Sequence, residues 1–408
     1  MVKTCRISVA NKVVVVVTNA IIAAFLMSCG GGGGAETKTT FGGTGDPNAP
    51  ADALFASGPL MTVGVAGIAA TGLDDRASAI FINTQAGQSF NALKLGMVAE
   101  VAGTIPTTAV STTAGTATNI VAESAVVGTI SAVDVANTRL TVLPLTVQMD
   151  QNTIFEGTSS FATMAVGNRI EVYGVPAAES KTILATRIIS LPATAATTFE
   201  VLGIATSVTA FQFTLQGVSV SMASVSSVIT PTGTVAGTTS IVENARVRVI
   251  GNYSATSNSI SATQIVAGIP TVRNDNSIIV LDGIVQSINA TGRFRLNDTD
   301  VDTTAANAAT VTVGSRVQVK GRKVAGVLTA TDFRRIAAGE RIQFIVQGDI
   351  ANLVSTANFT VRGESINAST ATFIGGTAAN LVNGRTVRIK AQAIGGHLEA
   401  IEVSFVTS

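Results

Sequence analysis

Residues 311–321 read VTVGSRVQVKG, and segments of the same form occur at four other places in the chain. The other copies are LKLGMVAEVAG (93–103), MAVGNRIEVYG (164–174), IVENARVRVIG (241–251) and LVNGRTVRIKA (381–391). The fourth residues of consecutive copies are 71, 77, 70 and 70 positions apart. A spacing of this size is long enough for a small domain with a core of its own, so the repeated segment predicts five tandem domains.

The fourth residue of the repeated segment is glycine in every copy except one, which has Asn244. Glycine and asparagine tolerate positive φ, so position four predicts a turn with left-handed backbone. Positions seven and nine are apolar in every copy, whereas position eight is polar. This period of two predicts a half-buried strand whose polar side faces water. The residues at position eight are Glu100, Glu171, Arg248, Gln318 and Arg388.

Further candidate strands flank each copy. A short strand with a glycine precedes it, and a return strand follows across a turn of the kind found in hairpins. Two more strands are clearest in the fourth copy, at RFRLN (293–297) and TDVDT (299–303). Five strands in about 65–70 residues suit a small barrel, so we predict an all-β fold with about five small five-stranded, OB-like β-barrel repeats. The first-strand glycines are Gly67, Gly128, Gly203, Gly283 and Gly348.

These features resemble a bacterial family known as domain of unknown function 5666, whose members are exported proteins with several small β-barrels and the pattern G-x-x-V-x-V-x-G. The resemblance spans residues 61 to about 406, and the second and fourth copies fit the pattern best. It implies a fold and export but no established activity. The predicted repeats are 61–122, 125–191, 199–268, 278–337 and 342–408.

The N-terminus has the features of a secretory signal. Residues 1–28 contain a basic start and a 14-residue apolar stretch, which as a helix is about 21 Å long and too short for the ~30 Å core of a bilayer. The segment LMSC (26–29) resembles the lipobox of bacterial lipoproteins, which implies a lipid anchor in the membrane at Cys29. Gly30 after the cysteine favours the outer membrane. The alternative is an ordinary signal peptide with an incidental cysteine. Residues 29–60, which contain a run of five glycines, predict a flexible tether.

The composition excludes several classes of protein. With 26 Lys+Arg against 25 Asp+Glu, the chain has no excess charge for binding nucleic acid, and we expect no such partner. One histidine and two cysteines near the N-terminus argue against His-based triads and Cys/His zinc sites. We therefore expect no catalysis, no cofactor and no metal. A hydrolase using the carboxylates of Glu171 and Asp150 is a distant alternative, since no carboxylates recur across the repeats.

Six basic residues of the fourth repeat form a candidate anion-binding site. They are expected on the outward side of a strand, in the next hairpin and on the return strand, where they either bind an anionic envelope polymer or form a solvated face. Barrels that bind oligonucleotides also need aromatic platforms, and this chain has no Trp and two Tyr. The six residues are Arg316, Lys320, Arg322, Lys323, Arg334 and Arg335.

Two smaller features predict no site. Asp298, Asp300 and Asp302 are spaced by two, but the glycine and glutamate of a calcium-binding loop are missing, so their carboxylates are expected on the solvent side of a strand. His397 follows two glycines and is expected to be an exposed turn residue.

These expectations together describe a non-catalytic lipoprotein of the bacterial envelope, anchored in the outer membrane and facing the periplasm or the cell surface. Its repeats would bind an envelope or extracellular partner, either a glycan or a protein. The alternative is an architectural spacer that holds a partner away from the membrane.

Overall fold

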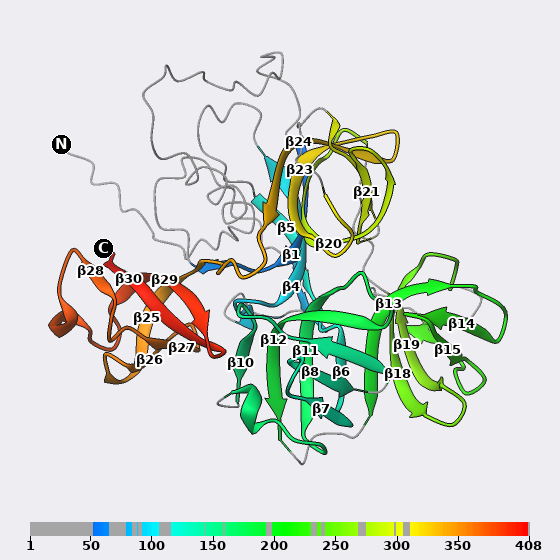
Figure 1. Cartoon of the computed structure of the whole chain (residues 1–408), viewed down its shortest axis with the longest axis horizontal. Coiled ribbons are helices and arrows are strands. Elements are labelled where there is room, and N and C mark those ends of the chain that lie inside the picture. Colours follow the sequence, from blue (N-terminus) through cyan, green and yellow to red (C-terminus); the bar gives the residue numbers. More distant parts are fainter. Residues whose placement is uncertain are drawn as a thin grey trace, which may run out of the picture.

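The computed structural model shows a chain built almost entirely of β-strands, which confirms the predicted fold class (Figure 1). The predicted signal segment, Cys29 and most of the predicted tether lie outside the described residues. The structure describes residues 52–64, 79–83, 88, 92–105, 116–142, 144–157, 160–192, 198–229, 235–237, 241–267, 275–297, 299–304 and 311–406.

The fourth repeat is a closed barrel of five strands. They follow the order β20–β21–β22–β24–β23, and β23 pairs back with β20. β22 runs parallel to β24 and the other pairs are antiparallel, as in an OB-like barrel. The two segments predicted as middle strands are therefore β21 and β22. The strands are β20 (Ile278–Ala290), β21 (Arg293–Leu296), β22 (Thr299–Asp302), β23 (Arg316–Val324) and β24 (Val327–Ile336).

The third and fifth repeats have the same ring of pairings. The third consists of β13 (Phe199–Thr206), β14 (Gln212–Leu215), β15 (Val218–Ser221), β18 (Arg246–Ser254) and β19 (Ser259–Ala267). The fifth consists of β25 (Phe344–Ser355), β26 (Asn358–Val361), β27 (Glu364–Asn367), β29 (Thr386–Ile394) and β30 (His397–Phe405). A short strand that the sequence pattern did not indicate runs parallel to the last strand of each: β16 (Val228–Ile229), which pairs with β17 (Val235–Ala236), and β28 (Thr372–Ile374).

The second repeat follows the same plan, but its first strand is divided into β6 and β7. β6 pairs with β11 and β7 with β8, and the sheet continues through β9 and β12 back to β11. β10 is again a short extra strand parallel to β12. The strands are β6 (Val126–Thr129), β7 (Ala132–Asp134), β8 (Arg139–Val142), β9 (Leu145–Gln148), β10 (Ile154–Glu156), β11 (Arg169–Pro176) and β12 (Thr182–Leu191).

The first repeat differs from the predicted one. Its described strands are β1 (Asp52–Pro59), β3 (Ala79–Ile82), β4 (Val98–Ile105) and β5 (Thr116–Ala122), in the order β1–β4–β5–β3. The assignment of residues 52–59 to a flexible tether is therefore wrong. β1 pairs with β4 on one edge and with β20 on the other, so ladder hydrogen bonds hold a segment whose Ala, Ser, Gly and Pro residues do not favour a strand.

The first-strand glycine of this repeat was also assigned to the wrong position. In the other repeats the predicted glycine is the residue paired with position seven, as Gly283 is with Val317. In the first repeat the residue paired with Ala99 is Gly58, and the predicted Gly67 lies outside the described residues.

Two positions of the repeated segment have unusual backbone geometry, a turn at position four and a β-bulge at position eleven. At position four φ is positive in all five repeats, including 65° at Asn244, which confirms the predicted left-handed turn. At position eleven the ladder between the fourth and fifth strands of each barrel contains a β-bulge. A Cβ on Gly321 would lie 2.0 Å from the carbonyl oxygen of Thr329, so the bulge there leaves no room for a side chain.

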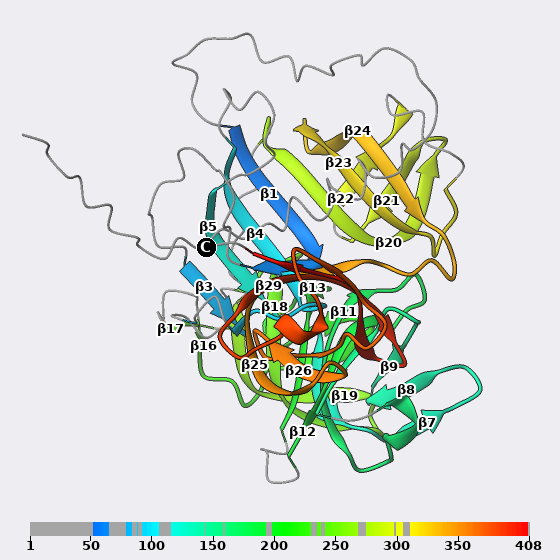
Figure 2. The same cartoon turned by 90° about the vertical axis from the view of Figure 1, so that its left-hand side faces the viewer.

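The repeats pack into one body rather than a string. β1 continues the sheet of the fourth repeat, β6 pairs with β13 of the third, and β2 (Thr62–Gly64) pairs with β25 of the fifth. One apolar core is shared by the first and fifth repeats and another by the second and third. Figures 1 and 2 show the first repeat, in blue to cyan, lying between the others.

Candidate functional site

A buried arginine joins the second repeat to the first and the fifth. Arg187 of β12 is 1% exposed, and its Nη1 donates to the carbonyl oxygen of Leu95 (2.8 Å) and to Oε2 of Glu364 (3.1 Å). Its Nε donates to Oε2 of Glu156 (3.0 Å). Burial by itself would lower the pKa of Arg187, but the two carboxylates outweigh it and raise that pKa. The junction therefore contains a permanent positive charge between two carboxylates.

The position-four turn of the first repeat is inserted into this junction. The backbone N–H of Leu95 donates to Oε1 of Glu364 (2.7 Å), and Oγ1 of Thr186 donates to the carbonyl oxygen of Gly96 (2.6 Å). Leu93 and Leu95 are buried at the same place. Polar groups of the second and fifth repeats thus hold the backbone of the turn, while its leucines fill the shared core.

A second charged junction joins the first three repeats. Arg248 of β18 is 1% exposed and donates from Nη2 to Oδ1 of Asn83 (3.1 Å). Arg246 on the same strand forms ion pairs with Glu100 and Glu123. Nη2 of Arg246 lies 3.0 Å from the Glu123 carboxylate, but without the alignment of a hydrogen bond. These arginines therefore bind the third repeat to carboxylates of the first repeat and of the segment that follows it.

The prediction that position eight faces water is wrong for most of the repeats. Glu100, Arg248 and Gln318 are 4%, 1% and 0% exposed, and Glu171 accepts a hydrogen bond from Nδ2 of Asn83 (2.6 Å). The polar side of the fourth strand faces another repeat in each of these cases. Among the described residues at position eight, the exposed one is that of the fifth repeat.

Two of the six basic residues of the fourth repeat are buried, which contradicts the solvated face predicted for them. Arg316 and Lys320 are 9% and 8% exposed, and Nε of Arg316 donates to Oδ1 of Asp282 (2.9 Å). Burial lowers the pKa of Lys320, and Asp332 opposes this shift. The outer side of β23 is covered by the first repeat, whose Met61 contacts this strand.

The other four basic residues are spread over the surface of the fourth repeat. Arg334 pairs with Glu340, and Nη1 of Arg322 donates to a backbone carbonyl oxygen (2.7 Å). Lys323 is half-buried and Arg335 is exposed. The structure does not bring the six residues together on one exposed face, so it offers no single basic surface for an anionic polymer.

The aspartates of β22 lie on its solvent side, as predicted. Asp300 and Asp302 pair with Arg295 (3.5 Å) and Arg293 (2.8 Å) of the neighbouring strand, and Asp298 lies outside the described residues. Hydrogen bonds from Thr304 and from Arg293 lower the pKa of Asp302. No group of acidic, His or Cys side chains in the described ranges is arranged to hold a metal ion. His397 is exposed, as predicted.

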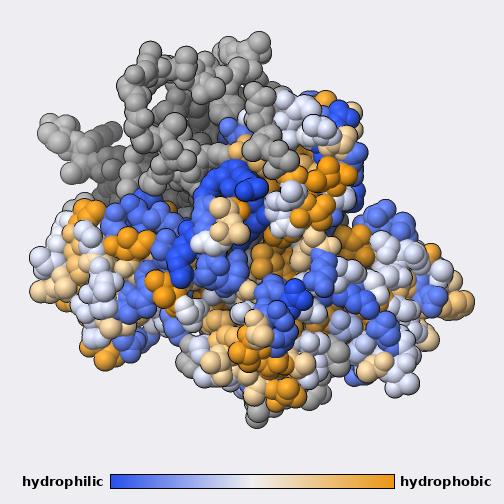
Figure 3. All heavy atoms as spheres, viewed as in Figure 1, coloured by the Kyte–Doolittle hydropathy of each residue, from blue (hydrophilic) through white to orange (hydrophobic). Residues whose placement is uncertain are grey.

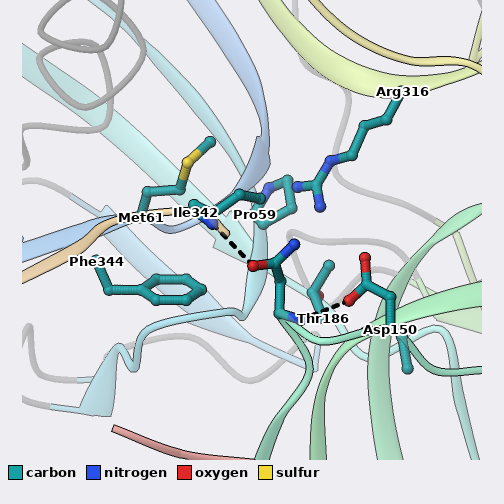
Figure 4. Close-up of a pocket in the computed structure, with 9 residues that line it drawn as sticks. Pro59, Met61, Asp150, Thr186, Arg316, Ile342 and Phe344 are labelled. Atoms are coloured by element: carbon teal, nitrogen blue, oxygen red, sulfur yellow. Dashed lines mark hydrogen bonds between the residues drawn. The ribbon is translucent and has the colours of Figure 1, made fainter. Parts of the chain in front are cut away.

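A small cavity lies beside the place where Arg316 meets the second and fifth repeats (Figure 4). Its volume is about 10 Å³, room for one water molecule. The carboxylate of Asp150 accepts a hydrogen bond from the backbone N–H of Asn152 (2.8 Å). The side-chain Oδ1 of Asn152 in turn accepts a hydrogen bond from the N–H of Ile342 (2.8 Å). Asp150 therefore stabilises a turn, whereas Glu171 binds the first repeat. The two carboxylates weighed for a hydrolase belong to different networks.

A much larger cleft, of about 820 Å³, lies between the first four repeats. Strands β1 and β4, the β11–β12 hairpin, β13 and β20 contribute to its walls. Apolar residues such as Val98 and Leu202 lie among polar ones in the lining. Figure 3 shows hydrophilic and hydrophobic residues interspersed over one face of the molecule. A volume of this size is in the range of small-molecule binding sites. The uncharged amides in the lining are Gln216, Asn244, Gln286 and Asn297.

The acidic residues of the cleft are neutralised by arginines. Arg246 pairs with two of them, Arg139 with a third and Arg316 with the fourth. The cleft consequently combines amide groups and apolar surface with little uncompensated negative charge. The acidic residues in the lining are Glu100, Glu123, Glu179 and Asp282.

The sequence reading missed a set of threonines at the bulges. In the second, third and fourth repeats the extra residue of the fifth strand is a threonine. In the third and fourth its Oγ1 donates to a carbonyl oxygen of the fourth strand at 3.1–3.3 Å, whereas in the second it lies 3.2 Å from that carbonyl oxygen and donates to the closer carbonyl oxygen of Gly96. The sequence contained a signal for them, because a threonine directly follows the alanine that recurs in the return strand of these repeats. These residues are Thr186, Thr263 and Thr331.

Comparison with known proteins gives a family for part of the chain. No helix within the described ranges is long and apolar enough to cross a membrane. No curated protein matches the sequence. Residues 127–189 and 274–332, which cover most of the second and fourth repeats, match the family described as a domain of unknown function (DUF5666), so the chain carries at least two domains similar to that family.

Proposed function

We propose that the protein is a non-catalytic binding protein of the bacterial envelope and that its central cleft holds a segment of a neutral glycan. The observation that carries this proposal is the amide-lined cleft of about 820 Å³ between four repeats. No single repeat could form such a site, because its walls come from strands of all four.

The chemistry of the lining favours a sugar over a charged ligand. An amide side chain offers a donor and an acceptor together, which is what neighbouring hydroxyl groups require. The acidic groups are already paired with arginines, so a polycation would find little free counter-charge. Of the basic residues in the lining, Arg246 and Arg295 also have carboxylate partners, which leaves Lys181 as a single site for an anion. Apolar residues in the walls, such as Leu202 and Ile204, suit the C–H faces of sugar rings.

The packing of the repeats favours binding over the alternative of an architectural spacer. A spacer gains reach from an extended chain of domains, whereas these repeats share cores and sheets. A compact body spans a shorter distance than an extended chain of domains, but it can form a binding site from several repeats.

Titration of the purified full chain with neutral and acidic oligosaccharides in a calorimeter tests the glycan proposal. Gln286 lines the cleft and is half-buried, so Gln286→Ala should weaken binding and Gln286→Trp should abolish it by filling the space. Gln264→Ala, on a half-buried glutamine of β19 outside the cleft, is the matched control and should bind normally. Binding that is unaffected by Gln286→Trp would move the site elsewhere.

The proposed location rests on the sequence of residues 1–60 and has a test of its own. Cys29→Ala should release the protein from outer-membrane fractions into the soluble fraction, because two or more acyl chains are what hold a lipoprotein stably. Retention of the variant in the membrane fraction would remove the lipid anchor from the proposal without affecting the cleft.

A further inference from the structure

The outer face of the fourth and fifth strands is used differently in the last repeat. In the first four repeats the residue at position eight of this face contacts another repeat. In the fifth repeat Arg388 is exposed. Lys390 beside it donates to Glu402, which also accepts from Ser404 of the same repeat. Within the described residues, no sister repeat covers this surface around Arg388. At its other end the hairpin touches the second repeat, where the N–H of Phe155 donates to the carbonyl oxygen of Gly396 (2.8 Å).

This surface, which we term the β29–β30 face, has an ordered charge pattern. Arg388 lies toward one end, where it is paired with Ser404, and Glu399 lies toward the other, where it is paired with Gln392. Lys390 and Glu402 form an ion pair between them at 2.9 Å, each 23% exposed. The face therefore carries a positive end, a neutral middle and a negative end.

An exposed isoleucine occupies the middle of the β29–β30 face. Ile401 is the extra residue of the bulge opposite Lys390 and is 43% exposed. Where the equivalent residue is exposed in other repeats, at Thr263 and Thr331, it is a threonine that donates to the opposite strand. The fifth repeat has instead an apolar side chain, which gains nothing from facing water.

We propose that a second copy of this chain docks on the β29–β30 face, forming a dimer with two-fold symmetry. A two-fold axis near Ile401 brings the two isoleucines together and places Arg388 of each copy opposite Glu399 of the other. A two-fold interface must be complementary to itself, and a face with opposite charges at its two ends meets that condition. A partner of uniform charge would be attracted at one end and repelled at the other.

The size of the face sets the expected strength. The nine-residue strands β29 and β30 form a strip roughly 30 Å long and 10 Å wide, and the three-residue β28 adds roughly 10 Å by 5 Å. The interface would bury on the order of 700 Å² in total, which is smaller than that of stable specific complexes and is the size of a weak, transient contact. The dimer should therefore be weak and should form at high micromolar concentrations, or where anchoring concentrates the protein on a membrane.

Sedimentation equilibrium of the full chain over a wide concentration range tests this proposal. We expect a reversible monomer–dimer equilibrium that Ile401→Thr weakens at least tenfold; this variant restores the residue type of the other repeats and should fold normally. Arg388→Glu should weaken the dimer similarly, and adding Glu399→Arg should restore it. Val354→Thr replaces a side chain that is 78% exposed near the end of β25, away from this face, and should change nothing.

Two results would overturn the proposal. One is a chain that remains monomeric at all concentrations. The other is a dimer that is insensitive to both Ile401→Thr and Arg388→Glu, or a charge swap that fails to restore it. None of these outcomes bears on glycan binding in the central cleft, which is formed by other repeats.

Discussion

Replacement of Arg187 by methionine tests whether the charged junction holds the repeats together. Methionine keeps much of the length and the apolar stem of arginine but removes the guanidinium. Glu364, which is 4% exposed on its side chain, would then be buried without its counter-charge, and the carbonyl oxygen of Leu95 would lose a donor at 2.8 Å. Removing one partner of a buried ion pair typically costs about 3–5 kcal/mol.

The loss of stability should be confined to the first, second and fifth repeats, because the junction connects only these three. Hydrogen–deuterium exchange followed peptide by peptide is therefore the suitable assay, since a multi-domain chain need not unfold in one step. We expect amides of the turn 93–97 and of β27 to lose about 3 kcal/mol or more of protection. The interior of the fourth barrel should be unaffected.

A matched control and a double variant make this prediction sharp. Arg293→Met breaks an ion pair whose arginine side chain is 62% exposed, and it should cost less than about 1 kcal/mol. Glu364→Gln added to Arg187→Met removes the stranded charge but keeps an acceptor for Leu95, so the double variant should be more protected than the single one. A loss below about 1 kcal/mol in Arg187→Met would refute the idea that this junction holds the assembly.

Three further predictions concern the turns, the bulges and pH. Asn244→Ala should lower stability by about 1 kcal/mol because φ is 65° there, whereas Asn244→Gly should be neutral or better, as measured by thermal unfolding. Gly321→Ala should cost about 1–3 kcal/mol or prevent folding of the fourth repeat, because its Cβ would clash with Thr329; proteolysis of the purified variant would reveal this. Burial would raise the pKa of Glu156, but Arg187 outweighs burial and lowers that pKa. The ionised carboxylate therefore stabilises the junction above its ordinary pKa of 4.5, and this stabilisation is lost as the pH falls below that value. Hydrogen–deuterium exchange of the 93–97 turn should become faster at acidic pH.

The repeated segment predicts the barrel correctly because each of its signals has a local cause. Positive φ at position four depends on one residue and its neighbours, which is why Asn244 could be recognised as a substitute for glycine. The alternation around Val317 and Val319 depends on one barrel core, and both side chains are fully buried. The five main strands and the position-four turns followed from these signals, whereas the short extra strands β10, β16, β17 and β28 did not.

The site could not be predicted in the same way, because it depends on contacts between repeats. A polar residue at position eight has the same sequence signature whether it faces water or an opposite charge on another repeat. Arg248 and Glu100 therefore read as solvent-facing residues, although both are buried. β1 was missed for a related reason, since its pairing with β4 and β20 does not show in the composition of residues 52–59.

The contact between Leu95 and Glu364 has a consequence for the synthesis of the protein. These residues are 269 positions apart, so at 5–20 residues per second the ribosome completes the second roughly 13–54 s after the first. During that interval the early turn lacks its carboxylate acceptor and the fifth barrel that encloses it. A chain that stops short therefore leaves its N-terminal repeat open to proteases. The first repeat therefore depends on the last one for part of its own packing.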